Sequence, residues 1–339
     1  MFVWTIFDLF AIVTRELRGI MMEYDKRLNL AIKLLDNTWV YKDSVHRFTT
    51  IFPFTNVNIA DSFSEFNFQD KSFLTIGSSC DPVINAAYLG SKDQTIIDIC
   101  PFTQDYFWLK KATHMSVDRK EFKDYLCYRS YFPHLVDNRN ALNPETFEKI
   151  TPYLRKSSYE SYLFWKNLFE KYSLKKRGEH LRRTLFTLDE ESGHILDKTN
   201  LYLEDDESYL KAREAMRSVV PTIIEADIYE YEGLGNYDNI NIANLAQFAT
   251  SELAIIRFKS LVERLAKSLN IDGTMLVAYL FDTTLNSPYT GPIIFDIPAT
   301  LELLKEYVSK FITFTSPCGI LWEDDRKPDS AIIYKKTIK

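Results

Sequence analysis

The 339-residue chain has only four cysteines, and their spacing excludes two common kinds of site. Cys80, Cys100, Cys127 and Cys318 lie far apart and form no CxxC pair, so neither a zinc site nor a disulfide framework is predicted. Because free thiols suit a reducing compartment, we expect a cytoplasmic protein without a bound metal.

The chain also lacks an excess of positive charge. It has 41 lysines and arginines against 47 aspartates and glutamates, which gives a formal net charge of −6. Nucleic acid is therefore not an expected partner. The composition is otherwise that of a globular protein, with 46% hydrophobic residues and 14% aromatic residues.

No apolar run is long enough to span a membrane. The most apolar segment, residues 1–13, is interrupted by Asp8 and lacks a basic leading region. We expect a helix that packs on the protein. Two alternatives stay open: translation that begins at Met21 or Met22, and a helix that lies in a membrane interface.

Several catalytic motifs are missing as well. The sequence contains no GxxxxGK[ST] loop, no GxSxG elbow and no HExxH pair, so common ATPase, hydrolase and metalloprotease sites have no support. The five histidines are scattered, and no catalytic residue is assigned. If a base is required, Tyr229, Glu230 and His194 are the candidates.

The most informative segment that is present is residues 72–111. It predicts an apolar strand, a Gly/Ser turn at Gly77, a helix opened by Pro82, and a second strand that ends at Asp98. A small-residue turn lets the backbone approach a ligand, and a carboxylate about 20 residues later can bind ribose hydroxyls. Asp98 follows Gly77 by 21 residues, which indicates an adenosine-containing cofactor.

The same alternation returns near the C-terminus and defines the fold class. The predicted strands are 73–76, 95–99, 222–226, 239–242, 273–280, 311–315 and 330–335, with helices near 243–269 and 299–310. Five parallel strands followed by an antiparallel hairpin predict an α/β fold with the Rossmann-like sheet of methyltransferases.

Helical patterns fill the intervening part of the chain. We expect an N-terminal helical cap or lid in residues 1–70, a cofactor-binding domain in residues 71–115 and 221–339, and a helical insertion in residues 116–220. The helices of the insertion are predicted at 119–131, 144–154, 159–172 and 207–219.

Ligands of open parallel sheets bind beyond the carboxyl ends of the strands. The turn after the first strand suits the amino-acid part of S-adenosylmethionine, Asp98 suits its ribose, and Asp227 suits its adenine amino group. The predicted cofactor-binding residues are Gly77, Ser78, Ser79, Asp81, Asp98, Ile99, Asp227, Ile228 and Asn244.

A dinucleotide cofactor is disfavoured. The turn reads GSSCDPVIN and lacks the third glycine of GxGxxG, and Asp81 would lie where a pyrophosphate needs positive potential. The aromatic segment 39–54 directly precedes the first strand, so we expect it to fold over the cofactor as a lid. The basic cluster in residues 175–183 is expected to be a solvated helix face, with an anionic-substrate site as the alternative.

At these residues the chain resembles the class I S-adenosylmethionine-dependent methyltransferases. More narrowly, FLTIGSSCDPVINAAYLG, IIDICPFTQDYFWLKKA, YDNINIANL and DSAIIYKK resemble poorly characterised bacterial relatives of the diacylglycerol 3-amino-3-carboxypropyl transferases. The resemblance covers about half of the chain and implies cofactor contacts at Gly77, Ser78, Asp81, Asp98 and Asn244. Cys80 and Cys100 stand where the lipid-forming relatives favour Gly and Asn, which argues against a lipid substrate.

The sequence thus predicts a transferase that uses S-adenosylmethionine, with methyl transfer to a small molecule as the leading hypothesis. Transfer of the 3-amino-3-carboxypropyl group of the same cofactor is the alternative within enzymes. A catalytically silent nucleotide-binding module is the alternative from another class.

Overall fold

The computed structural model describes most of the chain in separate ranges. They are residues 24–36, 49–55, 57–77, 79–126, 142–171, 185–186, 195–242, 245–246, 249, 251–280, 302–315 and 328–337. The predicted apolar helix of residues 1–13 and the basic cluster of residues 175–183 lie outside them.

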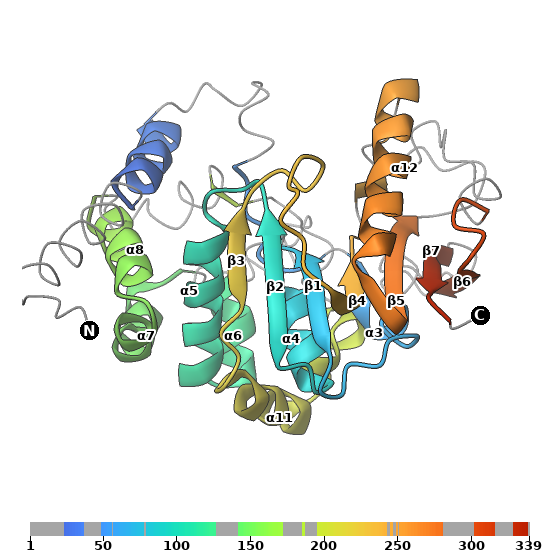
Figure 1. Cartoon of the computed structure of the whole chain (residues 1–339). Coiled ribbons are helices and arrows are strands. Elements are labelled where there is room, and N and C mark those ends of the chain that lie inside the picture. Colours follow the sequence, from blue (N-terminus) through green and yellow to red (C-terminus); the bar gives the residue numbers. More distant parts are fainter. Residues whose placement is uncertain are drawn as a thin grey trace, which may run out of the picture.

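The strands form one seven-stranded sheet in the order β3-β2-β1-β4-β5-β7-β6 (Figure 1). The first five pair in parallel, β7 runs antiparallel to β5, and β6 runs antiparallel to β7. This arrangement confirms the prediction of an α/β fold with a Rossmann-like sheet of five parallel strands followed by an antiparallel hairpin. The bounds are β1 Ser72–Ile76, β2 Asp93–Asp98, β3 Thr222–Glu225, β4 Tyr237–Asn241, β5 Leu269–Leu280, β6 Val308–Thr315 and β7 Pro328–Lys335.

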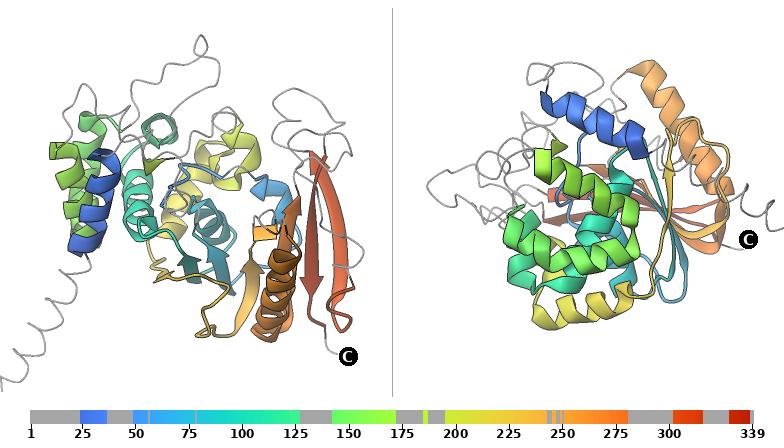
Figure 2. Two further views of the ribbon diagram at one scale, coloured as in Figure 1. Left: turned by 90° about the horizontal axis from the view of Figure 1, so that it is seen from above. Right: turned by 90° about the vertical axis from the view of Figure 1, so that its left-hand side faces the viewer.

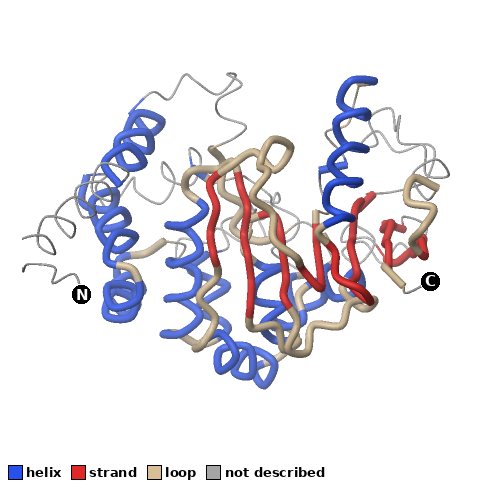
Figure 3. The backbone as a smooth tube through the Cα atoms, viewed as in Figure 1, coloured by secondary structure: helices blue, strands red, loops and turns tan. Residues whose placement is uncertain are grey.

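The described helices flank the sheet. Besides the helical residues 24–36, they are α3 Ile59–Ser62, α4 Asp81–Tyr88, α5 Thr103–Ser116, α6 Arg119–Leu126, α7 Pro144–Ser157, α8 Tyr159–Lys171, α10 Leu196–Thr199, α11 Asp206–Met216 and α12 Glu252–Lys267, with a short 3-10 helix at Leu201–Leu203. Figures 2 and 3 show α12 on one face of the sheet and α4 and α5 on the other, with α7, α8 and α11 beyond them.

Two large apolar clusters follow from this layering. One joins α4 and α5 to the helices of residues 116–220 and to the helical residues 24–36. The other joins α12 to the central strands β4 and β5. The predicted helical insertion therefore shares a continuous core with the first two helices of the sheet domain, and helices on both faces explain why the middle residues of β1 and β2 are buried.

In the C-terminal half of the chain, two predicted helices differ from the structure. The helix expected at 299–310 is wrong where the structure describes it, because residues 302–306 form turns and Val308–Thr315 is strand β6. Pairing of all eight β6 residues with β7 outweighs the local helix preference. The helix expected at 243–269 is shorter, because the Ser251 side chain accepts from the backbone N–H of Ala254 and starts α12 at Glu252.

None of the described helices is long and apolar enough to cross a membrane.

The helices α5, α6 and α11 bury an aromatic cluster where they meet. His114 on α5 is fully buried there, with its ring centroid 4.3 Å from that of Tyr209 and 5.5 Å from that of Phe122. Its Nε2 lies 3.1 Å from the carbonyl oxygen of Tyr209, which requires the hydrogen on Nε2, and burial lowers the pKa of His114 to about 3.

This histidine predicts acid sensitivity. Between pH 6.5 and 3 the unfolded chain binds a proton at His114 that the folded chain excludes, so the free energy of unfolding falls as the pH falls through this window. The expected loss is about 2 kcal/mol at pH 5. Urea unfolding of the wild type and His114→Phe at pH 7 and pH 5 measures it. The variant should lose less stability on acidification, and an equal loss would contradict the prediction.

Candidate active site

The order of the strands reverses between β1 and β4. β1 has β2 on one side and β4 on the other, so the direction in which the chain adds strands reverses at this point. In open parallel sheets the crevice beyond the carboxyl ends of such strands is where ligands bind. Gly77 follows β1 there, Asp98 ends β2, and Asn241 ends β4.

Gly77 and Asp98 lie against each other at this edge. A Cβ atom added to Gly77 would lie 2.5 Å from Asp98 Oδ2 and 2.5 Å from Thr103 Cγ2, so no side chain fits between the turn and the carboxylate. The other oxygen of Asp98, Oδ1, accepts from the backbone N–H of Cys100 at 2.9 Å. This bond orients the carboxylate at the strand end.

The turn after Gly77 closes tightly. The N–H of Cys80 donates to the carbonyl oxygen of Gly77 at 2.7 Å, and Cys80 has a φ of 62° in the left-handed region that favours glycine. A glycine would adopt this backbone conformation more readily than the cysteine that occupies the position. The Cys80 side chain is fully buried, and burial raises the pKa of its thiol, so it is not a reactive cysteine.

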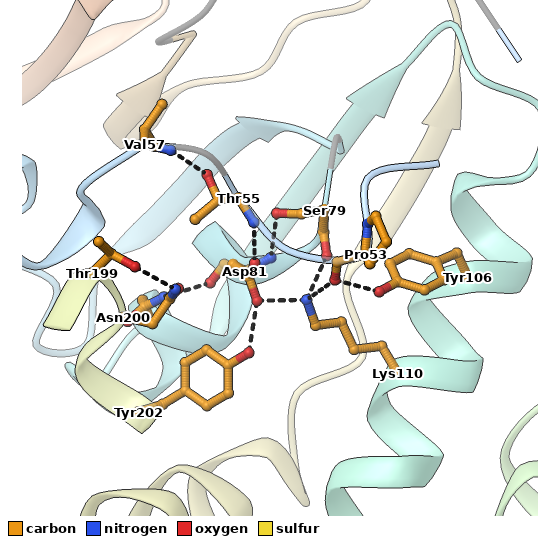
Figure 4. Close-up of polar contacts among 11 residues, drawn as sticks. Pro53, Thr55, Val57, Ser79, Asp81, Tyr106, Lys110, Thr199, Asn200 and Tyr202 are labelled. Atoms are coloured by element: carbon orange, nitrogen blue, oxygen red, sulfur yellow. Dashed lines mark hydrogen bonds and ion pairs between the residues drawn. The ribbon is translucent and has the colours of Figure 1, made fainter. Parts of the chain in front are cut away.

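Asp81 begins α4 and is held by three donors from other parts of the chain (Figure 4). Its Oδ1 accepts from Lys110 Nζ at 2.5 Å and from the Tyr202 hydroxyl at 2.7 Å, and its Oδ2 accepts from the Thr55 N–H at 2.6 Å. The side chains of Asp81 and Lys110 are both fully buried. Asp81 therefore stabilises the turn through buried contacts with other parts of the chain.

The ion pair also changes one step of the sequence argument. Asp81 was expected to oppose a pyrophosphate through its negative charge, but Lys110 neutralises that charge. The electrostatic argument against a dinucleotide is therefore wrong. The missing third glycine of the dinucleotide pattern remains as the argument from sequence.

The other predicted cofactor residues occupy different settings. Ile99 is 41% exposed and presents an apolar side chain next to Asp98. Ser79 is buried, and its Oγ accepts from the Asp81 N–H.

Two further predicted cofactor residues follow β3. Asp227 is half-buried, and its Oδ1 accepts from the Tyr229 N–H, whereas Ile228 is buried in the cluster with α12. Ser78 and Asn244 lie outside the described residues.

Two of the three candidate bases, Tyr229 and Glu230, lie among the described residues. Burial and the nearby Asp227 carboxylate raise the pKa of Tyr229, which opposes its use as a base at neutral pH. Glu230 is exposed and pairs with Arg257 at 3.4 Å. His194 lies outside the described residues.

The predicted lid is only partly described. Trp39, Tyr41, Lys42 and Arg47 lie outside the described residues. The end of the predicted lid, residues 51–54, and the described residues 55 and 57–58 after it form a largely buried segment that we call the strap. The Pro53 carbonyl oxygen in the strap accepts from the Tyr106 hydroxyl at 2.5 Å and from Lys110 Nζ at 2.9 Å.

The chain also has a surface cavity of about 300 Å³ between α6 and α7, away from the strand ends. Its polar groups are used within the protein. Asp118 and Asn143 accept backbone N–H groups at the starts of the two helices, and Glu121 binds Lys149 at 2.7 Å. The described residues contain no group of three histidine, cysteine, aspartate or glutamate side chains arranged for a metal.

Sequence reasoning missed Lys110, Thr55 and Tyr202 as partners of the turn. The available signal was a lysine four residues after Tyr106 on one helical face, and both side chains point to the Pro53 carbonyl. A lysine in a helix is ordinarily assigned to solvent, so hydrophobic patterning alone does not reveal it.

These features define a mixed α/β protein with a Rossmann-like sheet. No family model and no curated protein sequence matches the chain. It is similar to two structures of the N-methyltransferase NodS from Bradyrhizobium japonicum WM9. For one, the identity is 8% over 82% of this chain and 90% of that chain, with a TM-score of 0.34. The other is in complex with S-adenosyl-l-homocysteine. Its identity is 7% over 91% of this chain and 98% of that chain, with a TM-score of 0.36.

A third similar structure is the rRNA methyltransferase aviRa from Streptomyces viridochromogenes. The identity is 9% over 81% of both chains, and the TM-score is 0.35.

Proposed function

We propose that this protein is an S-adenosylmethionine-dependent transferase that moves a methyl group to a small molecule. The observation that carries the proposal is the contact of Gly77 with Asp98 at the switch point of the sheet. A carboxylate at the end of β2 can accept hydrogen bonds from both hydroxyls of a ribose. The glycine lets the turn after β1 pack directly against that carboxylate.

The residues present fit this cofactor. Ile99 offers an apolar surface for an adenine ring beside the ribose position. The turn from Gly77 to Cys80 is the segment that would face the amino-acid portion. Asp227 follows β3, where a carboxylate can accept from an adenine amino group. When bound, the sulfonium of the cofactor supplies an already activated methyl group, so the protein's task is to position it and to exclude water.

Binding of S-adenosylhomocysteine tests the proposal by calorimetry. We expect Asp98→Ala to weaken the affinity by about 100-fold, because two charge-assisted hydrogen bonds to the ribose are lost. The matched control is Asp93→Ala, because Asp93 begins the same strand at the opposite edge of the sheet and is exposed. It should bind within twofold of the wild type. A wild type that does not bind would refute both transferase hypotheses.

The nucleoside product distinguishes the two transfer reactions. Incubation with S-adenosylmethionine and a pool of small-molecule acceptors, followed by mass spectrometry, should yield S-adenosylhomocysteine. Methylthioadenosine as the product would instead establish transfer of the 3-amino-3-carboxypropyl group.

A further inference from the structure

We propose that Lys110 is a positioning residue for the cofactor site, which ties the strap to the Gly77–Cys80 turn and so holds the turn in its ligand-binding shape. This inference rests on the proposed function, and it gives one buried lysine an indirect part in binding the amino-acid end of the cofactor, through the shape of the turn. Figure 4 shows Lys110 reaching from α5 to both segments.

The three hydrogens of the Lys110 ammonium have three acceptors. They are the Pro53 carbonyl oxygen at 2.9 Å, the Ser79 carbonyl oxygen at 2.9 Å and Asp81 Oδ1 at 2.5 Å. The first acceptor belongs to the strap, the second to the turn, and the third to the first residue of α4, directly after the turn. One side chain therefore connects three segments that are distant in sequence.

The remaining bonds of the network complete the same connection. Asp81 Oδ2 accepts from the Thr55 N–H, so the strap is bound to the turn by Lys110 at Pro53 and by Asp81 at Thr55. The Phe54 side chain between them places its ring centroid 4.3 Å from Lys110 Nζ, within cation–π range. The strap is thereby fixed along three consecutive residues.

The cost of this arrangement indicates a role beyond packing. Lys110 and Asp81 are both fully buried, and apolar residues of similar volume can often replace a buried ion pair without loss of stability. An apolar pair cannot make directional hydrogen bonds, whereas the ammonium binds two carbonyl oxygens at once. The Cys80 backbone, which is held in the left-handed region, is the part of the turn that most needs such support.

The experiment compares two nucleosides that differ in the part the turn would contact. S-adenosylhomocysteine carries the amino-acid portion, and methylthioadenosine lacks it. Lys110→Met alone leaves Asp81 buried without its counter-charge and endangers folding, so the working variant is the double substitution Lys110→Met with Asp81→Asn. Circular dichroism and thermal unfolding establish that it is folded.

A neighbouring lysine provides the matched control. Lys111 is next to Lys110 on the same helix and is 2% exposed, but its Nζ donates to the Val219 carbonyl oxygen, near the start of β3. Lys111→Met removes a buried cation without touching the strap or the turn.

We expect the double variant to bind S-adenosylhomocysteine at least tenfold more weakly than the wild type and to bind methylthioadenosine within threefold. Lys111→Met should bind both within twofold. Hydrogen exchange should show faster exchange of the Thr55 and Cys80 amides in the double variant only. Affinities for both nucleosides that fall together, or that do not fall, would overturn the proposal while leaving the proposed function intact. A wild type that binds neither nucleoside would overturn both.

Discussion

Gly77→Ala should reduce the affinity for S-adenosylhomocysteine by at least about 100-fold, because displacement of the Asp98 carboxylate would remove its charge-assisted hydrogen bonds to the ribose. The added methyl group would lie 2.5 Å from both Asp98 Oδ2 and Thr103 Cγ2, so the carboxylate, the helix start or the turn must move. The free energy of unfolding should fall by about 1–3 kcal/mol, which is typical of overpacking. Calorimetry and urea unfolding measure the two effects.

A second glycine controls for the substitution itself. A Cβ atom added to Gly235 would have no neighbouring atom within 4 Å, and Gly235→Ala should leave both affinity and stability within experimental error. Equal affinities for Gly77→Ala and the wild type would show that the β1 turn is not the ligand site. They would thereby remove the main support for the proposed function.

The sheet was predictable because its signals are local. Pro82 and Gly90 bracket α4 in the sequence, and in the structure Pro82 lies in its first turn while Gly90 has a φ of 106°. The apolar runs before Gly77 and Asp98 have no polar alternation, which is typical of strands covered on both faces. The predictions were less successful where pairing decides the structure, as at β6, whose conformation depends on its contact with β7.

The site was predictable only as far as strand ends determine it. The positions of Gly77 and Asp98 follow from the parallel order of β1 and β2, so their spacing is readable in sequence. The partners of Asp81 come from segments 26, 29 and 121 residues away, and no local pattern relates them to the turn. Hydrophobic patterning also assigns charged side chains to the surface. For this reason the sequence predicted that Asp81 contacts the ligand, and it did not predict the buried ion pair with Lys110.

The same limit applies to the ion pair that anchors the helical residues 24–36. Arg27 Nε lies 3.0 Å from Asp105 Oδ2 on α5, and Arg27 Nη2 lies 3.2 Å from Glu160 Oε2 on α8. The Asp105 side chain is fully buried, and its Oδ1 accepts from the Ser161 hydroxyl at 2.9 Å. Desolvation raises the pKa of Asp105 to about 6, although Arg27 acts in the opposite direction.

Arg27→Met should therefore destabilise the protein by about 3–5 kcal/mol near neutral pH, because it leaves the Asp105 carboxylate buried without a counter-charge. The control is Arg217→Met. Arg217 pairs with Glu214 at 2.9 Å, but both side chains are more than half exposed, and the expected cost is below about 1 kcal/mol. Urea unfolding of both variants measures the difference.

The pH dependence of the Arg27→Met effect identifies its cause. Without Arg27 the folded-state pKa of Asp105 must rise further above 6, so the folded variant retains a proton at pH values where the wild type has lost it. The folded variant then binds more protons than its unfolded state up to that higher pKa, and its stability continues to fall with rising pH after that of the wild type has levelled off. The stability difference between the two proteins should consequently be smaller at pH 5 than at pH 8. A difference that is constant between these pH values would mean that Arg27 stabilises the helix through its packing, and that the charge of Asp105 is not the source of the loss.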